Sequence, residues 1–345
     1  YEKVQKYQEE QHKENSYITI LGLHKKLPIQ DAWIKLNILT EEELKRKQTE
    51  TQWDFLNQYD EYSGRRSGKT YDAETLVIEP GNKVVLAGPG MGKSTLCKKL
   101  FLQAGAMNKF AIKVRLWDVA GYMREGVAFE IALCKAMCQS LAVEFTKAEL
   151  AHFFSIIILD GLDECGDYRR TVAKSIAAWG YGHPYQMIIV TSRPIGYDLT
   201  ELADYNHYQI LPMDEWQMES SSQKLMELVQ QDCEKQYQWF RKRLQNYELH
   251  KLACRSPLVL GFMVQLSLQK KDFGNSKISL YQEIVNEWLQ GSSRDNEKII
   301  SEVELLYGIE AIAFYMMSHV SDEAREVYTK NNIITYVGER FIEEM

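Results

Sequence analysis

The sequence predicts an α/β fold in which helices cover a parallel sheet, followed by a mainly helical region. Three observations carry this prediction. Short apolar runs of strand length alternate with helical patterns up to about residue 211. A glycine-rich turn joins one of these apolar runs to a helix. Beyond Asp214 strand patterns almost vanish, while helical periodicity continues to Glu339.

Length and composition are those of an ordinary soluble protein with several domains. The 345 residues are enough for two or three domains with a sizeable core. Because 41 basic residues stand against 48 acidic ones, no overall basic surface indicates nucleic-acid binding. No apolar run approaches the roughly 20 residues that span a bilayer, and no signal peptide is visible. We therefore expect a cytoplasmic protein without a membrane partner.

The cysteines and the chain ends give two further expectations. The six cysteines lack the spacing of a disulfide framework or a metal site, so we expect buried free thiols. The chain begins at Tyr1 rather than at a methionine, and its last helical pattern runs to Met345. We therefore expect a piece of a longer polypeptide.

The first 52 residues predict one helix and two short strands. Residues 1–15 are polar and suit a linker helix. Residues 17–20 and 32–36 predict strands, separated by a turn through residues 26–28. Residues 41–47 predict a charged helical turn with a solvated face.

A second glycine-containing motif, from Gly64 to Thr70, ends like a phosphate-binding loop. No apolar strand precedes it and no apolar helix follows it, and Ser63 stands where the first glycine would be. We expect a flexible basic loop here.

The sequence from Lys83 to Thr95 has the form of a P-loop. Residues 84–86 predict a buried strand, and Gly92-Lys93-Ser94-Thr95 opens an apolar helical pattern. Backbone N–H groups and the helix N-terminus would wrap nucleotide phosphates, while Lys93 neutralises the outer phosphates and Ser94 offers its hydroxyl to Mg²⁺. Ala87 replaces the usual first glycine, and a small residue still fits. The predicted nucleotide-binding residues are Gly88, Pro89, Gly90, Met91, Gly92, Lys93, Ser94 and Thr95.

Strands and helices continue to alternate after the P-loop. Further strands are predicted at residues 110–116, 153–159, 187–190 and 208–211, with helices at 129–141 and 168–179. This alternation favours a parallel sheet wrapped by helices.

An acidic cluster ends the apolar strand at residues 153–159. An acidic side chain at the tip of a buried strand needs a cation, and the natural partner of Asp160 is the Mg²⁺ bound by Ser94. Asp163 and Glu164 could orient or deprotonate a water aimed at the γ-phosphate. We take Glu164 as the base, and Asp163 either as a residue that supports the metal ligands from behind or as a co-base. A capping cluster at a helix start is the alternative without function.

Arg193 ends the strand at residues 187–190 and would lie at the same edge of the sheet. It would point toward the γ-phosphate and sense hydrolysis by losing its charged partner. An ordinary surface arginine is the alternative.

Four segments carry a resemblance to a known family. The run Ile156-Ile-Ile-Leu-Asp-Gly-Leu-Asp-Glu164, followed by Val190-Thr-Ser-Arg-Pro194, resembles the NACHT family of STAND signalling NTPases. Residues 110–120 are similar to its second strand. Residues 252–260 are similar to the helical segment whose proline packs near the adenine, here Pro257. The resemblance covers about residues 17–289. The later histidine motif of the family is not found, and His319 is a poor candidate for it.

The resemblance implies an ASCE-type P-loop sheet with flanking helices, followed by a helical domain and a winged-helix domain. The expected domains are residues 1–52 as linker helix and lead-in strands, 53–211 as nucleotide-binding domain, 212–292 as helical domain, and 293–345 as the start of the winged-helix domain.

The resemblance also implies a signalling switch, the middle part of a protein with an N-terminal effector and a C-terminal sensor. Residues 16–28 are similar to the lead-in of bacterial members, which act largely in antiphage defence. The implied cofactors are ATP or ADP and Mg²⁺, with slow or trigger-dependent hydrolysis. The implied partners are further copies of the chain in an active oligomer and a protein trigger such as a phage component.

Three alternatives compete with this switch. An AAA+-like remodelling machine would hydrolyse ATP continuously and would need an arginine finger acting in trans, for which no arginine stands out over Arg193. A small-molecule P-loop kinase would lack the Asp-Gly-x-Asp-Glu element. A scaffold with a dead site is disfavoured because Lys93, Ser94, Asp160 and Glu164 are all present.

Overall fold

The computed structural model describes residues 1–19, 25–40, 70–139, 141, 143–194 and 197–292. The chain forms two compact units, Tyr1–Lys271 and Asp272–Met345. Among the described helices, none is both long and apolar enough to cross a bilayer. The expected helical turn at 41–47, nearly all of the second glycine motif, and the region from 293 onward with His319 lie outside the described residues.

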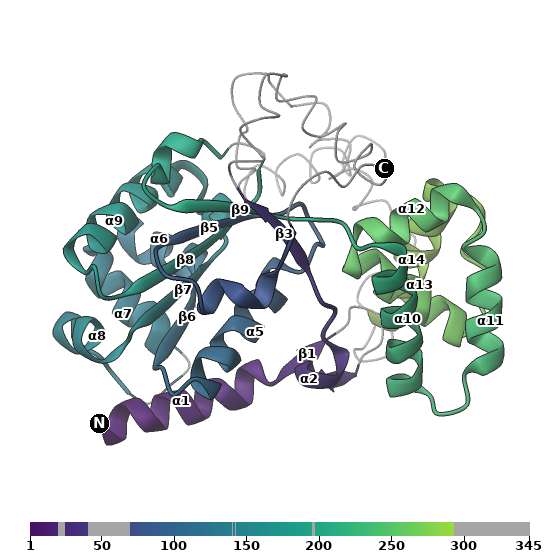
Figure 1. Ribbon diagram of the computed structural model, residues 1–345, viewed down its shortest axis with the longest axis horizontal. Coiled ribbons are helices and arrows are strands. Elements are labelled where there is room, and N and C mark those ends of the chain that lie inside the picture. Colours follow the sequence, from purple (N-terminus) through teal and green to yellow (C-terminus); the bar gives the residue numbers. More distant parts are fainter. Residues whose placement is uncertain (20–24, 41–69, 140, 142, 195–196, 293–345) are drawn as a thin grey trace, which may run out of the picture. The chain divides into compact units, whose positions relative to one another are not determined.

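A seven-stranded sheet forms the centre of the first unit, in the order β4-β3-β9-β5-β8-β7-β6 (Figure 1). The strands are β3 Asn37–Thr40, β4 Tyr71–Asp72, β5 Lys83–Leu86, β6 Ala111–Arg115, β7 Ile156–Asp160, β8 Met187–Ser192 and β9 Asn206–Ile210. The five strands from β9 to β6 are parallel, while β3 and β4 extend the sheet with antiparallel pairing. The predicted α/β class with a parallel-dominated sheet is therefore confirmed.

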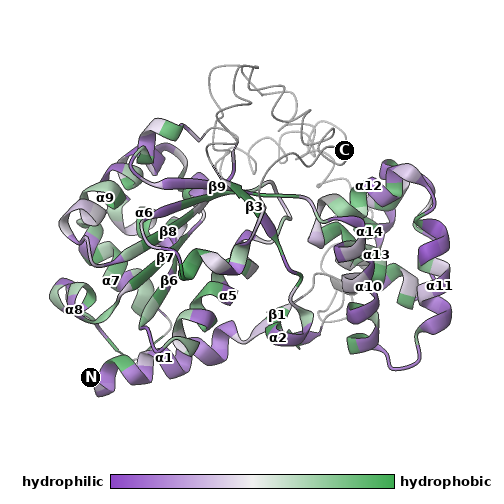
Figure 2. Ribbon diagram, viewed as in Figure 1, coloured by the Kyte–Doolittle hydropathy of each residue, from purple (hydrophilic) through white to green (hydrophobic). Residues whose placement is uncertain are grey.

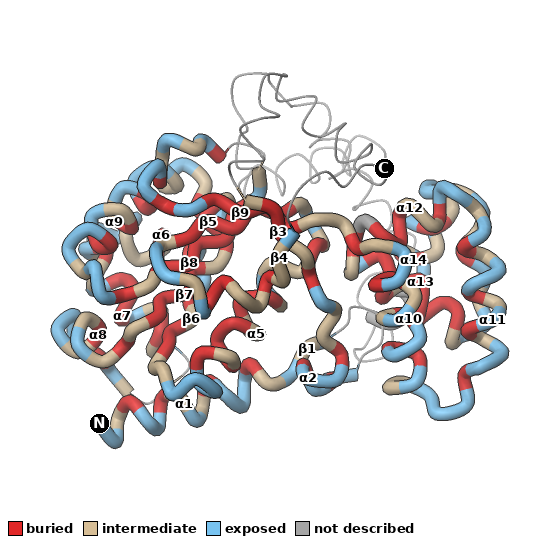
Figure 3. The backbone as a smooth tube through the Cα atoms, in the orientation of Figure 1, coloured by how far each residue is buried: buried red, intermediate tan, exposed pale blue. Residues whose placement is uncertain are grey.

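Helices cover both faces of this sheet, which explains why its central strands carry apolar side chains on both faces. Ile157 of β7 points into a core shared with the helices α1 (Glu2–Asn15), α6 (Leu116–Arg124), α7 (Phe129–Cys138) and α9 (Arg169–Gly182). Ile156 and Ile158 point into a core shared with α5 (Lys93–Ala106) and the 3-10 helix η1 (Ala73–Val77). Figure 2 shows the hydrophobic strands between helices of mixed hydropathy, and Figure 3 shows the same strands as buried. Because the sheet is covered on both sides, its functional groups can reach solvent only at the strand ends.

The helices follow the alternation predicted from the sequence. In the sheet region they are α1 Glu2–Asn15, α2 Ile29–Ala32, α5 Lys93–Ala106, α6 Leu116–Arg124, α7 Phe129–Cys138, α8 Lys147–Phe153 and α9 Arg169–Gly182, with 3-10 helices η1 Ala73–Val77, η2 Leu162–Tyr168 and η3 Leu199–Leu202. After the sheet come α10 Glu215–Val229, α11 Glu234–Arg243, α12 Tyr247–Arg255 and α13 Pro257–Leu268, and the second unit contains α14 Lys277–Ser292. All six cysteines are free thiols, as expected.

The lead-in to the sheet differs from the prediction. The predicted turn at residues 26–28 is strand β2, Lys26–Pro28, which pairs antiparallel with β1, Tyr17–Thr19. The predicted strand at residues 32–36 is instead the end of α2 and a non-regular segment, and β3 begins only at Asn37. The apolar side chains of residues 32–34 and Leu36 line a cleft beside the P-loop, so their pattern reflects that cleft rather than a strand.

A buried lysine fixes the start of the strand that carries the P-loop. The Lys83 ammonium donates hydrogen bonds to the carbonyls of Glu79 and Gly81, each at 2.6 Å. Burial lowers the pKa of Lys83 to about 8. These bonds hold the turn before β5 against the first residue of the strand. They therefore stabilise the start of the strand that leads into the P-loop.

Candidate nucleotide-binding site

The P-loop lies between β5 and α5 and has the backbone that its sequence predicts. Gly90 and Gly92 have φ angles of 71° and 90°, values that side chains with a Cβ rarely adopt. Gly92 is the N-cap of α5, so the helix begins at Lys93. The N–H groups of the first turn of α5 therefore face the loop, which is the geometry that binds a phosphate.

The side chain of Lys93 folds back over this loop. Its ammonium donates to the carbonyl of Ala87 at 3.0 Å and contacts that of Gly88 at 3.4 Å. Desolvation lowers the pKa of Lys93, while the carboxylates of Asp163, Asp160 and Glu164 oppose that shift. Lys93, with Arg193 nearby, thus faces three acidic groups at the end of the sheet.

A cleft of ≈ 330 Å³ opens above the P-loop. Its polar lining residues include Lys93, Ser94, Glu164 and Arg193. Its apolar lining comes mainly from two regions: Ile18, Ala32, Trp33, Ile34 and Leu36 of the lead-in, and Leu225, Pro257 and Leu258 of α10 and α13. A cleft that combines a few polar groups with apolar side chains suits a nucleotide, which has charged phosphates and a flat base.

Asp160 is held in place by the neighbouring strand. It ends β7, and the hydroxyl of Thr191 on β8 donates to its Oδ1 atom at 2.6 Å. The same hydroxyl accepts a hydrogen bond from the N–H of Gly161 at 3.0 Å. Thr191 was not singled out in the sequence, although a polar residue directly after the apolar run of β8 is a signal that could have identified it.

Asp163 forms a two-point contact with Arg193. The backbone N–H of Arg193 donates to Oδ1 of Asp163 at 2.9 Å, and the Arg193 Nε lies 3.0 Å from Oδ2. Asp163 is only 12 % exposed, whereas Arg193 is 49 % exposed and lines the cleft. Asp163 therefore holds the arginine at the rim of the cleft with both of its carboxylate oxygens.

Glu164 projects into the cleft from a tight turn at Gly161. The φ angle of Gly161 is 83°, and a Cβ at this position would come within 3.0 Å of the Glu164 carboxyl group. Desolvation, together with the negative charges of Asp163 and Asp160, raises the pKa of Glu164. A carboxylate with a raised pKa is a better proton acceptor, which is the property that a general base needs.

The first turn of α13 makes direct hydrogen bonds to the P-loop. The carbonyl of Gly90 accepts from the Ser256 hydroxyl at 3.1 Å and from the N–H of Leu258 at 3.2 Å. Leu258 N–H belongs to a helix terminus, where N–H groups lack partners inside the helix. The helices after the sheet are therefore joined to the phosphate-binding loop itself.

The residues present fit a nucleotide with Mg²⁺. Among the described residues, no group of three or more His, Cys, Asp or Glu side chains could hold a metal ion by itself. Mg²⁺ in nucleotide sites is commonly held by one or two carboxylates together with substrate phosphates. Asp160 and the exposed hydroxyl of Ser94 offer that oxygen donor set beside the P-loop.

The structure brings most of the predicted site residues to one cleft. Its lining includes Gly88, Pro89, Gly90, Met91, Gly92, Lys93, Ser94, Thr95, Glu164, Arg193 and Pro257. Asp160 and Asp163 are not among its lining residues; they contact Thr191 and Arg193. Residues 252–260 are expected near the nucleotide from the resemblance, but the hydrogen bonds of Ser256 and Leu258 to Gly90 are not predicted, because they depend on how a distant helix packs.

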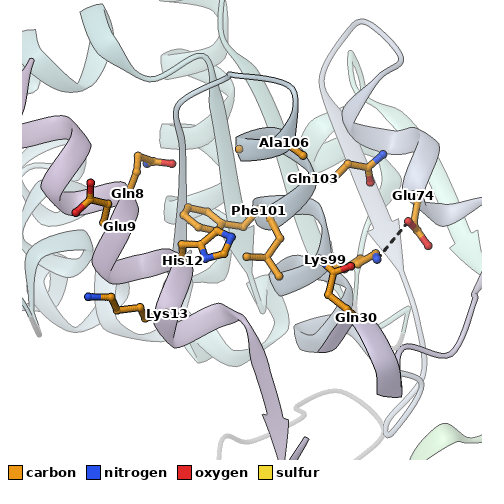
Figure 4. A pocket seen from close by; sticks show the side chains of 12 residues that line it. Gln8, Glu9, His12, Lys13, Gln30, Glu74, Lys99, Phe101, Gln103 and Ala106 are labelled. Carbon is orange, nitrogen blue, oxygen red and sulfur yellow. Dashed lines mark ion pairs between the residues drawn. The ribbon is translucent and has the colours of Figure 1, made fainter. Parts of the chain in front are cut away.

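A second cleft of ≈ 780 Å³ lies between α1 and α5. Figure 4 shows that its walls carry side chains of both charges, including the pair of Lys99 and Glu74 at 3.6 Å. It contains no residue of the P-loop and none of the acidic cluster. The P-loop and Glu164 therefore line the first cleft and not this one.

Comparisons with known proteins complete this description. No protein-family model matches the chain, and a search of curated proteins finds no match either. Among solved structures it is similar to domain III of the replication initiation protein DnaA of Thermotoga maritima, with 13 % identity, a TM-score of 0.30, and coverage of 77 % of this chain and 88 % of that chain. It is also similar to the ORC1 protein of Aeropyrum pernix in complex with DNA, with 12 % identity, a TM-score of 0.36, and coverage of 79 % and 74 %.

At these values the likeness carries no argument about function. The fold follows from the strand order: β5, which leads into the P-loop, is separated from β7, which ends in Asp160, by the single strand β8. That order and the P-loop give the chain an ASCE-type P-loop NTPase fold.

Proposed function

We propose that the chain is the central part of an ATP-dependent signalling switch of the NACHT and STAND type. The observation that carries the proposal is the wall of the nucleotide cleft. It contains the P-loop, the lead-in and the helices α10 and α13, and the Gly90 carbonyl bonds directly to the start of α13. A nucleotide in this cleft would touch both the sheet and the helices that follow it.

The residues of the cleft have separate roles in this proposal. The P-loop N–H groups and Lys93 bind the phosphates, and Ser94 and Asp160 would hold Mg²⁺, which supplies charge neutralisation at the β- and γ-phosphates when bound. Glu164 accepts a proton from the attacking water. Arg193, which Asp163 holds in place, would respond to the presence of the γ-phosphate. The base packs in the apolar end, against Pro257.

A nucleotide can shift the orientation of two parts only if it contacts them differently in two states. Backbone hydrogen bonds connect the segment between the sheet and the following helices to both of these parts. The N–H of Leu211 donates to the carbonyl of Asn37, and the N–H of Met213 donates to the carbonyl of Cys254. The predicted hinge is residues 212–220; because α10 begins at Glu215, we propose that its non-helical part, residues 212–214, acts as the hinge. The resting state would be closed and monomeric, and a protein trigger would open it to an oligomer that activates effector domains of a longer chain.

Steady-state ATP hydrolysis and particle mass together test this proposal on the full-length protein. Slow turnover, with a multi-subunit particle that forms in ATP only when a trigger such as a phage protein is added, supports the switch. Fast, partner-independent turnover would favour an AAA+-like remodelling machine instead. A particle that stays monomeric in its active state would refute the switch.

Replacing Ser256 with glycine should speed nucleotide release about 2- to 10-fold. Glycine removes the hydroxyl that donates to Gly90 but remains an acceptable N-cap for α13. One lost hydrogen bond of ordinary net strength, about 0.5–1.5 kcal/mol, corresponds to that range. The measurement is displacement of a fluorescent ADP analogue by excess ADP. Ser256→Thr, which keeps a hydroxyl, is the matched control, and an unchanged release rate in Ser256→Gly would argue against coupling through this contact.

A further inference from the structure

One hydroxyl group contacts both Asp160 and the turn that carries Glu164. The Thr191 side chain is completely buried, at 0 % exposure. It donates to Oδ1 of Asp160 at 2.6 Å and accepts from the N–H of Gly161 at 3.0 Å. The donor of this hydroxyl and one of its two acceptor lone pairs are therefore used within the site.

The strand pairing explains why Thr191 can make both contacts. β7 and β8 are parallel neighbours, and Leu159 lies opposite Val190. The next residue of each strand is Asp160 and Thr191, so the two side chains leave the sheet at the same edge. The chain then turns at Gly161, whose N–H meets the same hydroxyl.

The turn that Thr191 holds also sets the position of Glu164. Gly161 has left-handed backbone angles, and its carbonyl accepts a hydrogen bond from the N–H of Glu164 at 3.0 Å. Its missing Cβ leaves room for the Glu164 carboxyl group. A change in the Gly161 turn would therefore be passed on to the proposed base.

We propose that Thr191 is the positioning residue that sets the metal-binding geometry of Asp160 and links it to the Gly161 turn that carries Glu164. Because Thr191 engages Oδ1 of Asp160, it orients the carboxylate that would hold the cation. Hydrogen-bond partners of this kind orient a ligand, and their loss commonly reduces metal affinity about 10- to 100-fold. This inference rests on the proposed nucleotide site and adds a residue outside the P-loop and the acidic cluster.

The test is a magnesium titration of nucleotide binding by the full chain. Binding of a fluorescent ATP analogue is measured at increasing Mg²⁺, and again with the metal removed by EDTA. For Thr191→Val, which keeps the shape but loses the hydroxyl, we expect the Mg²⁺ concentration at half-saturation to rise about 10- to 100-fold. Affinity in EDTA should change by less than about twofold, because the P-loop contacts remain.

Three variants separate positioning from folding. Thr191→Ser restores the hydroxyl and should return the Mg²⁺ dependence to that of the unchanged chain. Ser192→Ala removes an equally buried hydroxyl from the same strand, one that donates to the carbonyl of Arg193. This variant should leave the Mg²⁺ dependence unchanged. Thr191→Cys introduces a side chain close in size to serine with a weak donor, so it provides the magnesium test if the valine variant fails to fold.

The outcomes distinguish this inference from the proposed function. If the unchanged chain does not bind the ATP analogue with Mg²⁺, the proposed function is wrong and this inference falls with it. If the unchanged chain binds and folded Thr191→Val or Thr191→Cys shows the same Mg²⁺ dependence, only the role of Thr191 is wrong. A serine variant as defective as the valine variant would also overturn that role, because the loss would then come from packing.

Discussion

Replacing Lys93 with alanine should weaken ATP binding by about 100-fold or more. Of the described residues that line the cleft, the cations are Lys93 and Arg193, and Arg193 is already paired with Asp163. Loss of hydrogen bonds from an ammonium group to two phosphates removes about 3 kcal/mol or more, which corresponds to that factor. The three carboxylates that face Lys93 would also lose their counter-charge, so the empty site would repel phosphate more strongly.

Equilibrium binding of a fluorescent ATP analogue measures this effect. Lys99→Ala is the matched control, because Lys99 lies on the same helix but pairs with Glu74 in the second cleft. The control should bind nucleotide as the unchanged chain does. An affinity for the ATP analogue that is unchanged in Lys93→Ala would contradict the assignment of residues 87–95 as a P-loop.

The parts of the site that the sequence predicts are those with a local cause. The P-loop requires small residues, left-handed glycines and a helix start within one short segment, so residues 87–95 contain the whole pattern. Asp160 is marked by its place at the end of an entirely apolar strand. Buried parallel strands are apolar on both faces, so the apolar runs predict the parallel part of the sheet. The same reasoning does not predict the antiparallel edge formed by β3 and β4.

The parts that escaped prediction depend on contacts between distant segments. An apolar run such as residues 32–36 fits a strand and a cleft wall equally well, and only packing decides between them. Ser256 lies 166 residues from Gly90 in the chain, so no local pattern could indicate their hydrogen bond. The ranking of Glu164 above Asp163 as the base is made from the sequence, but its physical reason, the contact of Asp163 with Arg193, depends on packing.

The position of Arg193 makes the expected effects of replacing Glu164 and of replacing Asp163 different. Both oxygens of Asp163 engage Arg193, through its backbone N–H and its guanidinium group. Glu164 lines the cleft, and desolvation raises its pKa. Of the two, Glu164 is better placed to accept a proton, and Asp163 is better placed to hold the arginine.

Glu164→Gln should therefore slow ATP hydrolysis about 10²- to 10⁴-fold, the usual contribution of a general base, while nucleotide binding stays intact. Glutamine keeps the shape of the side chain but cannot accept the proton. Asp163→Asn should slow hydrolysis less, because it weakens the charge that holds Arg193 and leaves the base in place. Single-turnover hydrolysis and equilibrium binding, measured on both variants, separate the chemical step from affinity. A larger loss of turnover in Asp163→Asn than in Glu164→Gln would exchange the two roles, with Asp163 as the base and Glu164 as its support.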